Sequence, residues 1–448
     1  MDLEEKILIK ATENEKKMIS LLQKLVRIPS RTGEEGDAQE FLTKYLRDRG
    51  LKVEMWEPDV KELFRKFPMN AQYPSHWQHD LILPYTHRPT YRDLSRSGKM
   101  DVLNYRDRPN VIARFGKKRG GRSIILNGHI DTVTLEPRSG WTHDPFGGEI
   151  VKGKLYGRGA SDMKGGLVAA IGAIEAILEA GLEIKGEVIF ESVVNEEHAG
   201  NGTLACLCKG IRADGAIVTE PSGNNVYTGN HGGIYWGVQV KGNPSSPGAR
   251  WIGKKQFGVS AVEKLPSLIQ GLVKLEAKQR RRKEETNPFS LVIGKVEGGI
   301  YETATAPDCT MKGVVYFGPE IGRIVDVQRL LRDTLRESSK GDPWLREFPP
   351  ELFFLHDDDP SRQDPKHPLV SVMAKAAQEA SGIRPRVTGS PFACDMRHLK
   401  NQGKIPTVIY GPGASHQAHR PDEYFPVAEM LPAVKALALA IYRWCNGT

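Results

Sequence analysis

The spacing of apolar and polar positions along the chain predicts its helices and strands. Apolar residues recur at intervals of three and four over residues 18–26, which is typical of one helical face, and Pro29 ends this segment. A second helix is predicted over residues 37–49, with Gly50 at its end. Between residues 60 and 108 this periodicity disappears and Pro, Tyr and His become frequent, which predicts a long irregular insertion. The pattern leaves open whether this insertion lines a site or only covers the surface.

After Pro109, short apolar runs alternate with helical ones. Strands are predicted over residues 123–126, 188–190 and 216–218, and a helix over residues 163–180. Alternation of strands and helices is typical of an α/β domain with a largely parallel sheet. The same pattern resumes near the C-terminus, with a helix, a strand and a helix over residues 369–380, 407–410 and 427–444.

The segment between these two parts has a different order of elements, beginning near Tyr235. Its pattern predicts strand, helix, strand, strand, helix, strand over residues 236–241, 260–282, 291–293, 313–317, 326–337 and 351–355. This order is typical of a compact α+β unit of the ferredoxin-like kind. We therefore expect one α/β domain that is interrupted by an inserted α+β domain.

Length and composition are consistent with this two-domain organisation. A chain of 448 residues exceeds one ordinary hydrophobic core, so two or three domains are expected and we adopt two. No apolar run approaches the roughly 20 residues that span a bilayer, so no membrane partner is expected. The first residues lack the basic start and apolar stretch of a secretory signal, which favours a cytoplasmic protein.

Cysteine content and charge add two further expectations. Five cysteines in so long a chain form no disulfide framework and are expected to be reduced and structural. The net charge of +8 is spread along the sequence, and its densest basic run, residues 280–283, is followed at once by Glu284 and Glu285. This run is expected to be a solvated helix face, and no nucleic-acid partner is predicted.

Residues with metal-binding chemistry follow several of the predicted strands. His129 and Asp131 come after the strand at residues 123–126, and in extended geometry they point to the same side. An acidic residue two positions from a histidine can accept its second N–H and make it a better ligand. Taken alone, this pair is more often ordinary surface polarity.

Further carboxylates occupy similar positions. Asp162 lies in a glycine-dense turn at a helix start, where it could cap the helix or bridge two cations. Glu196 and Glu197 follow the strand at residues 188–190, where they could form an exposed acidic turn or, if buried, indicate a nearby cation or a proton carrier. Glu220 ends a further strand, and His419 lies in the segment after the strand at residues 407–410. Together they are the oxygen and nitrogen ligands that zinc and its neighbours prefer.

At these motifs the sequence resembles the zinc-dependent deacylase and exopeptidase family that includes acetylornithine deacetylase, succinyl-diaminopimelate desuccinylase, aminoacylase-1 and carboxypeptidase G. The resemblance extends over nearly the whole chain and rests on residues 126–133, 157–166, 195–197, 219–222 and the His419 segment. It implies a zinc-exopeptidase-like catalytic domain over residues 1–230 and 357–448. It also implies a lid over residues 231–356 that mediates homodimerisation.

The resemblance also implies a role for each of these site residues. Two divalent metal ions are implied, most often zinc, with manganese or cobalt as alternatives. Asp162 would bridge them, Glu197 and His419 would complete one metal site, and His129 and Glu220 the other. Asp131 would hold His129, and Glu196 would be the general base. His416 lies close to His419, but the family pattern does not make it a ligand.

The lid departs from the family pattern at two positions. Ser246 aligns with a histidine that stabilises the oxyanion in the partner subunit's site, and an asparagine expected near Thr303 is missing. Either the reaction differs from ordinary deacylation, or another group such as His231 or Arg250 substitutes, or activity is impaired.

The resemblance also places Asp395 and Arg397 at the substrate pocket. Arg397 could recognise an anionic group of the substrate or form a structural salt bridge. The function expected first is hydrolysis of an N-acyl amide bond in a small amino-acid-like substrate. The alternatives are hydrolysis of another C–N bond, in an aromatic amine or a formamide, and a non-catalytic binding protein on the same fold.

Overall fold

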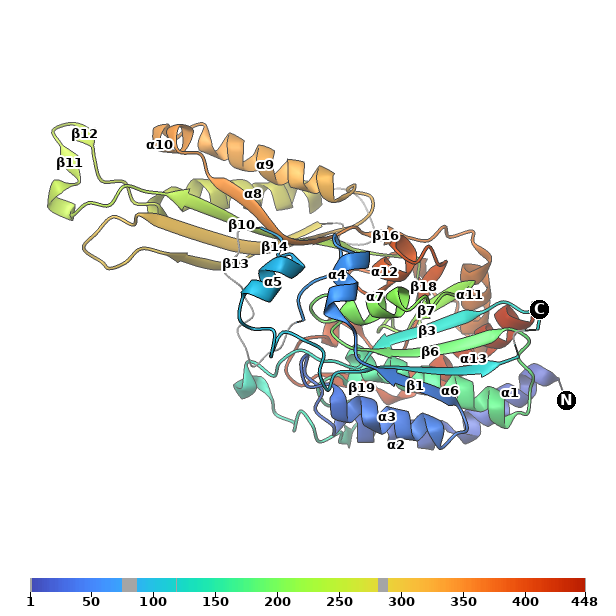
Figure 1. Cartoon of the computed structure of the whole chain (residues 1–448). Coiled ribbons are helices and arrows are strands. Elements are labelled where there is room, and N and C mark those ends of the chain that lie inside the picture. Colours follow the sequence, from blue (N-terminus) through green and yellow to red (C-terminus); the bar gives the residue numbers. More distant parts are fainter. Residues whose placement is uncertain (1, 75–86, 118, 281–288, 448) are drawn as a thin grey trace.

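The computed structural model describes residues 2–74, 87–117, 119–280 and 289–447, and it divides into a larger and a smaller part (Figure 1). The chain ends described lie near each other on the larger part. A mixed sheet of order β1-β2-β6-β3-β7-β18-β8-β17 runs through this part. Its strands are β1 (Lys52–Trp56), β2 (Asn110–Gly116), β3 (Ile124–His129), β6 (Glu187–Val193), β7 (Gly215–Val218), β8 (Val226–Tyr227), β17 (Val387–Thr388) and β18 (Thr407–Ile409).

The sheet is parallel at its centre and has antiparallel pairings toward both edges. Strands β6, β3, β7 and β18 are parallel neighbours. Strand β2 pairs antiparallel with both β1 and β6, and β8 pairs antiparallel with β18. Every residue of β3 is buried, as expected for a strand that is covered on both faces. The expectation of a largely parallel sheet therefore holds for the central strands, while β2 and β8 have antiparallel pairings.

Helices cover both faces of this sheet. Helix α6 (Gly165–Glu179) packs against α1 (Leu3–Glu13), α2 (Glu15–Val26) and α13 (Met430–Asn446), which in turn packs on α11 (Pro368–Ser381). On the opposite face α7 (Asn201–Cys208) contacts α4 (Val60–Lys66) and α12 (Met396–Asn401). Helix α3 (Gly36–Arg47) lies on the same side as α6, where its Tyr45 hydroxyl donates to Glu175, and it contacts the edge strands β1 and β2. This three-layer arrangement buries the apolar strands and leaves their ends to carry polar groups.

The smaller part, the lid, is an antiparallel sheet of order β13-β14-β10-β15 with two long helices and the short α10 (Pro343–Glu347), which confirms the expected ferredoxin-like α+β unit. Its elements are β10 (Gly232–Lys241), α8 (Leu265–Arg280), β13 (Phe289–Gly298), β14 (Asp308–Phe317), α9 (Ile324–Ser339) and β15 (Glu351–Asp358). Alternate residues of β10, among them Ile234 and Trp236, are buried in a hydrophobic core of their own, and Tyr235 lies on the other face. The lid limits at 231 and 356 stay a prediction.

The insertion at residues 60–108 packs on the main core and also contacts the lid. Its described residues form two short helices, α4 and α5 (Tyr91–Arg96), and bury Leu63, Leu94 and Tyr105. The Arg88 guanidinium pairs with Asp357 of the lid at 2.6 Å, and Gln72 contacts His356. Residues 75–86 lie outside the described part. The described part of the insertion is therefore more than surface covering, since it connects the two domains.

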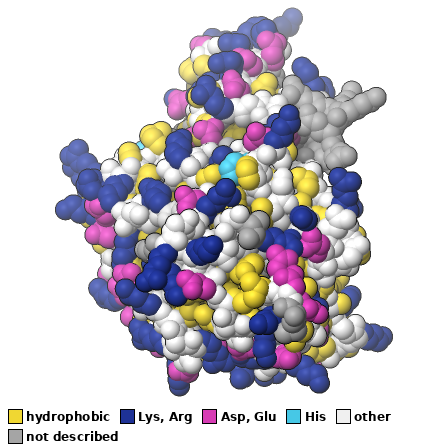
Figure 2. Space-filling view, turned by 90° about the vertical axis from the view of Figure 1, so that its right-hand side faces the viewer, with side chains coloured by type: hydrophobic (Ala, Val, Ile, Leu, Met, Phe, Trp, Pro, Cys, Tyr) yellow, Lys and Arg dark blue, Asp and Glu magenta, His cyan; other side chains and the backbone are white. Residues whose placement is uncertain are grey.

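The described surface carries charges of both signs, and the cysteines are unpaired. Figure 2 shows Lys and Arg side chains mixed with Asp and Glu over one face. Arg280 ends α8 and is exposed, while the rest of the basic run at residues 281–283 lies outside the described residues. All five cysteines are free thiols, and among the described residues no helix has the length and apolar character to cross a membrane.

Gly166 sets how closely α6 approaches the end of β7. A Cβ at this position would lie 1.8 Å from the Thr219 carbonyl oxygen, next to Glu220. We expect Gly166→Ala to force these elements apart, to lower stability by roughly 1–3 kcal/mol and to weaken metal binding. Urea unfolding measures the change in stability, and metal titration measures the change in metal affinity. Gly248→Ala is the control because no atom lies within 4 Å of its Cβ position, and equal behaviour of the two variants would contradict this account.

Candidate metal centre

The candidate ligands lie at the carboxyl edge of the parallel strands, where several chain segments meet. His129 is the last residue of β3, and Glu196 and Glu197 lie in the turn after β6. Glu220 follows β7, and His419 lies in the segment after β18. In open α/β sheets this edge is where ligands bind, since the loops that leave parallel strands converge there.

Asp162 lies between the two histidines. Its Oδ1 is 3.2 Å from His129 Nε2, and its Oδ2 is 3.5 Å from His419 Nε2. His129 Nε2 also lies 3.7 Å from Glu220 Oε1, and His419 Nε2 lies 2.9 Å from Glu197 Oε2. Tetrahedral ligands about 2.0–2.2 Å from one zinc ion are roughly 3.3–3.6 Å apart. The observed separations are close to that spacing, so this donor set fits metal ions.

Asp162 belongs to an irregular turn and not to the helix that follows it. It lies in the irregular turn Ala160–Lys164 before α6, with φ −116° and ψ 96°, and the peptide bond to Met163 is cis. These dihedral angles are not helical, and the Asp162 carboxylate does not cap α6, whose N-cap residue is Lys164. The capping alternative is therefore wrong.

Several carboxylates are buried together at this site, which favours the binding of positively charged groups there. Burial raises the pKa of Glu196 to about 8 and the pKa of Asp131 to about 7, and it also raises the pKa of Glu220 well above its usual range. The negative charge of Glu197 raises the pKa of His419 to about 9. Carboxylates in such surroundings bind protons unless cations compensate their charge. The raised pKa values and the spacing of the donor atoms therefore both indicate a cation site.

Asp131 holds His129 through its backbone oxygen and not, as the side-chain spacing suggested, through its carboxylate. His129 Nδ1 donates to the backbone oxygen of Asp131 at 2.9 Å, whereas the carboxylate Oδ1 is 3.7 Å away. The carboxylate instead accepts the backbone N–H groups of Glu196 and Glu197 at 3.1 and 3.3 Å, and the Thr32 hydroxyl at 2.8 Å. Asp131 thus fixes the His129 tautomer through its main chain, and it fixes the turn with both glutamates through its side chain.

Glu423 is a supporting residue that the sequence analysis did not single out. Its buried carboxylate accepts the backbone N–H groups of Ser161 and Asp162 at 2.9 and 3.1 Å, and it pairs with Arg158 at 2.7 Å. These bonds hold the turn that presents Asp162. The only sequence signal was the acidic residue four positions after His419.

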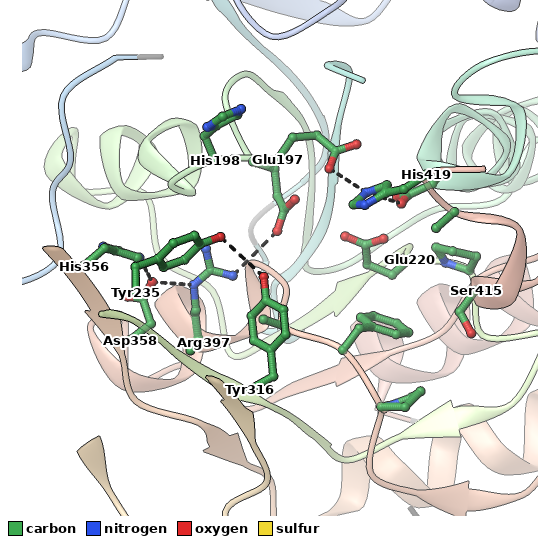
Figure 3. Close-up of a pocket in the computed structure, with 18 residues that line it drawn as sticks. Glu197, His198, Glu220, Tyr235, Tyr316, His356, Asp358, Arg397, Ser415 and His419 are labelled. Atoms are coloured by element: carbon green, nitrogen blue, oxygen red, sulfur yellow. Dashed lines mark hydrogen bonds and ion pairs between the residues drawn. The ribbon is translucent and has the colours of Figure 1, made fainter. Parts of the chain in front are cut away.

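A cavity of about 310 Å³ lies between this edge and the lid (Figure 3). The catalytic domain contributes candidate ligands and Phe392, and the lid contributes Gly233, Tyr235, Tyr316, His356 and Asp358. The sequence analysis missed these lid residues. They come from three strands, and only the lid topology brings them together.

Arg397 reaches this cavity but already has two acidic neighbours. Its Nε lies 3.3 Å from Asp358 Oδ2, and its Nη1 lies 3.6 Å from Glu196 Oε1. Asp358 has a lowered pKa despite its burial, because His356 and Arg397 stabilise the ionised form. The pairing of Arg397 agrees with the structural salt bridge considered from the sequence.

The structure does not bring the other candidates to the cavity of this chain. His231 is buried and does not line it; its backbone N–H donates to the Phe392 carbonyl oxygen, and burial lowers the pKa of its imidazole to about 4. Asp395 is buried and accepts the Thr203 hydroxyl at 2.5 Å. Arg250 pairs with Glu263 beside the hairpin of β11 (Trp251–Ile252) and β12 (Lys255–Gln256), at the far end of the lid in Figure 1. Neither exposed Ser246 nor exposed His416 lines the cavity.

Comparison with known proteins identifies the class to which this fold and site belong. The family model of Peptidase family M20/M25/M40 matches residues 125–443. Two relatives are named N-formyl-4-amino-5-aminomethyl-2-methylpyrimidine deformylase. The one from Halalkalibacterium halodurans is 28% identical over 99% of this chain and 97% of the relative. The one from Bacillus subtilis is 32% identical over 78% of this chain and 85% of the relative.

Solved structures show the same fold. A dipeptidase from Saccharomyces cerevisiae has a TM-score of 0.70 at 16% identity, covering 100% of this chain and 99% of that chain. The chain belongs to Peptidase family M20/M25/M40, which confirms the family resemblance. It is an enzyme of the metal-dependent amide hydrolases that make up this family.

Asp131→Asn tests how the glutamate turn is held. The variant keeps the main-chain bond to His129 but loses one carboxylate acceptor, so we expect metal affinity to fall by roughly 10–100-fold. Competition with a chromogenic chelator measures this change. Asp214→Asn is the matched control, since Asp214 accepts the Ser123 N–H at the opposite end of β3. An unchanged affinity in Asp131→Asn would rule out this role.

Proposed function

We propose that this enzyme is a deformylase that hydrolyses the formamide bond of an N-formyl aminomethyl pyrimidine or a close heteroaromatic analogue. The observation that supports this proposal is that Arg397 is already paired with Asp358, in a cavity lined by aromatic side chains. In addition, 99% of this chain aligns with a relative named as a deformylase of such a pyrimidine. A formamide is itself an N-acyl amide, so this proposal keeps the N-acyl hydrolysis expected first and specifies a formyl group as the acyl group.

The cavity supports a small, flat and uncharged substrate. Its volume of about 310 Å³ is at the lower end of ligand pockets and suits one small ring with a short arm. Tyr235, Tyr316 and Phe392 line it with aromatic surface, to which a heteroaromatic ring can stack. Arg397 is the one Lys or Arg side chain among the described lining residues, and its neighbours Asp358 and Glu196 already compensate its charge. A substrate carboxylate would have to compete with both.

We propose the ligand roles implied by the family for two divalent ions, with zinc as the metal. Asp162 would bridge them, Glu197 and His419 would complete one site, and His129 and Glu220 would complete the other. Such a pair of ions would polarise the scissile carbonyl and make bound water more acidic. The two carboxylate oxygens of Asp162, each near a different histidine, support the bridging role.

Glu196 is positioned to move the proton. Its Oε2 lies 3.9 Å from His129 Nε2, so its carboxylate borders the proposed ions while also facing the cavity. It takes a proton from the attacking water and returns it to the leaving nitrogen as the C–N bond breaks. Formate and the free aminomethyl compound are then the products.

We also propose a homodimer through the lid and a cytoplasmic location. The lid sheet and its helices form a separate core that projects from the catalytic domain, which leaves a surface for a second copy (Figure 1). The five free thiols fit a reducing compartment. Sedimentation velocity of the full chain tests the dimer.

A product assay tests the substrate proposal. Purified zinc-loaded enzyme is incubated separately with an N-formyl aminomethyl pyrimidine, its N-acetyl analogue and an N-succinyl amino acid. Formate release from the first compound at a kcat/KM well above that for the other amides is expected. Preference for the N-succinyl compound would refute the deformylase proposal and favour an amino-acid substrate. Release of ammonia from the ring would indicate a deaminase.

Glu196→Gln tests the proposed proton carrier. The variant keeps the size of the side chain but cannot accept a proton, so we expect kcat to fall by about 10²–10⁴-fold. Metal content, measured by mass spectrometry, should remain at the wild-type level because Glu196 is not a proposed ligand. A variant with near wild-type kcat would exclude Glu196 as the base.

A further inference from the structure

The lid of this chain lacks the two family residues that are implied in oxyanion stabilisation. Ser246 and Thr303 mark the altered positions, and neither lines the cavity. His231 and Arg250, considered as substitutes from the sequence, do not line it either. The reaction still requires hydrogen-bond donors aimed at the carbonyl oxygen, where negative charge develops.

Two lid tyrosines face the place where that charge would develop. In the antiparallel pairing of β10 with β14, Gly233 lies opposite Tyr316 and Tyr235 lies opposite Val314. Residues two positions apart share a sheet face, so Tyr235 and Tyr316 are diagonal neighbours on the face away from the lid core. A Cβ at Gly233 would lie 3.0 Å from Tyr316 Cε1, so the glycine leaves the space in which this ring lies.

The two hydroxyl groups meet over the cavity. The Oη atoms of Tyr235 and Tyr316 are 3.4 Å apart, and both side chains line the cavity together with Asp162, Glu196 and Glu220 (Figure 3). When one hydroxyl donates to the other, the second keeps its proton for another acceptor. Burial raises the pKa of Tyr235, and the neighbouring Tyr235 and burial raise that of Tyr316, so both stay protonated donors near neutral pH.

We propose that the Tyr235 and Tyr316 hydroxyl pair is the oxyanion donor of this enzyme, supplied by the same chain that holds the metal ligands. This inference rests on the proposed amide hydrolysis. As the water oxygen bonds to the carbonyl carbon, the C=O π electrons move to the oxygen, which accepts a hydrogen bond from a tyrosine hydroxyl. When the C–N bond breaks, that electron pair re-forms the C=O bond, and the nitrogen receives the proton from Glu196.

Removal of the hydroxyl groups separates this role from ring stacking. Tyr235→Phe, Tyr316→Phe and the double variant keep the aromatic rings and lose only the donors. On the best amide substrate of the wild type, we expect kcat of the double variant to fall by about 10²–10³-fold with KM nearly unchanged. Tyr442→Phe, on the remote helix α13, is the matched control. A raised KM with unchanged kcat would overturn the proposal, since the tyrosines would then only bind the ring.

A binding measurement tests the donors without turnover. Methylphosphonate is a tetrahedral anion and acetate is a planar one, and both can be titrated calorimetrically into zinc-loaded wild type and double variant. We expect methylphosphonate affinity to fall about tenfold in the variant, as for one hydrogen bond to a charged group, and acetate affinity to change less. Equal methylphosphonate affinity in both proteins overturns the proposal. Failure of the formamide assay alone would refute only the substrate.

Discussion

Four carboxylates and two histidines cluster at the edge of the sheet beside one small cavity, and this concentration of buried acid constrains the rest of the structure. Asp162 lies within 3.5 Å of a nitrogen of each histidine, and the pKa of Glu196 is raised to about 8, mainly by burial. Such an arrangement is unfavourable without compensating cations. It also requires a rigid backbone, because ligands that could relax apart would lose affinity for the ions. The hydrogen bonds from main-chain N–H groups to Asp131 and Glu423 supply this rigidity.

The two domains have different tasks at the cavity. The sheet edge supplies the proposed ligands and the base, whereas the lid supplies aromatic rings, hydroxyl groups and Asp358. Arg397 of α12 contacts Asp358 of β15, and it also contacts Glu196. Since Gln72 and Arg88 also contact the end of β15, the insertion takes part in fixing the lid. The environment of Glu196 therefore depends on how the domains are held together.

Much of this architecture could be predicted from the sequence, because the ligands follow apolar runs whose parallel arrangement brings their ends together. His129, Glu220 and the Glu196–Glu197 pair are examples. The contribution of the lid could not be predicted, since a shift of one residue in register would turn Tyr235 and Tyr316 to the opposite face. Nor could the role of Glu423, whose partner Asp162 lies 261 positions away. Strand β1 was not predicted because it is a largely exposed edge strand without a continuous apolar run.

The central claim is that these residues hold a pair of metal ions in the cavity. Its most direct test is an anomalous-difference map from crystals of the zinc-loaded protein, measured on both sides of the zinc absorption edge. The account predicts two peaks about 3.5–4 Å apart, with Asp162 between them and the histidines on opposite sides. A map with no zinc peak in the cavity, or with a single peak that Asp162 does not contact, would contradict it.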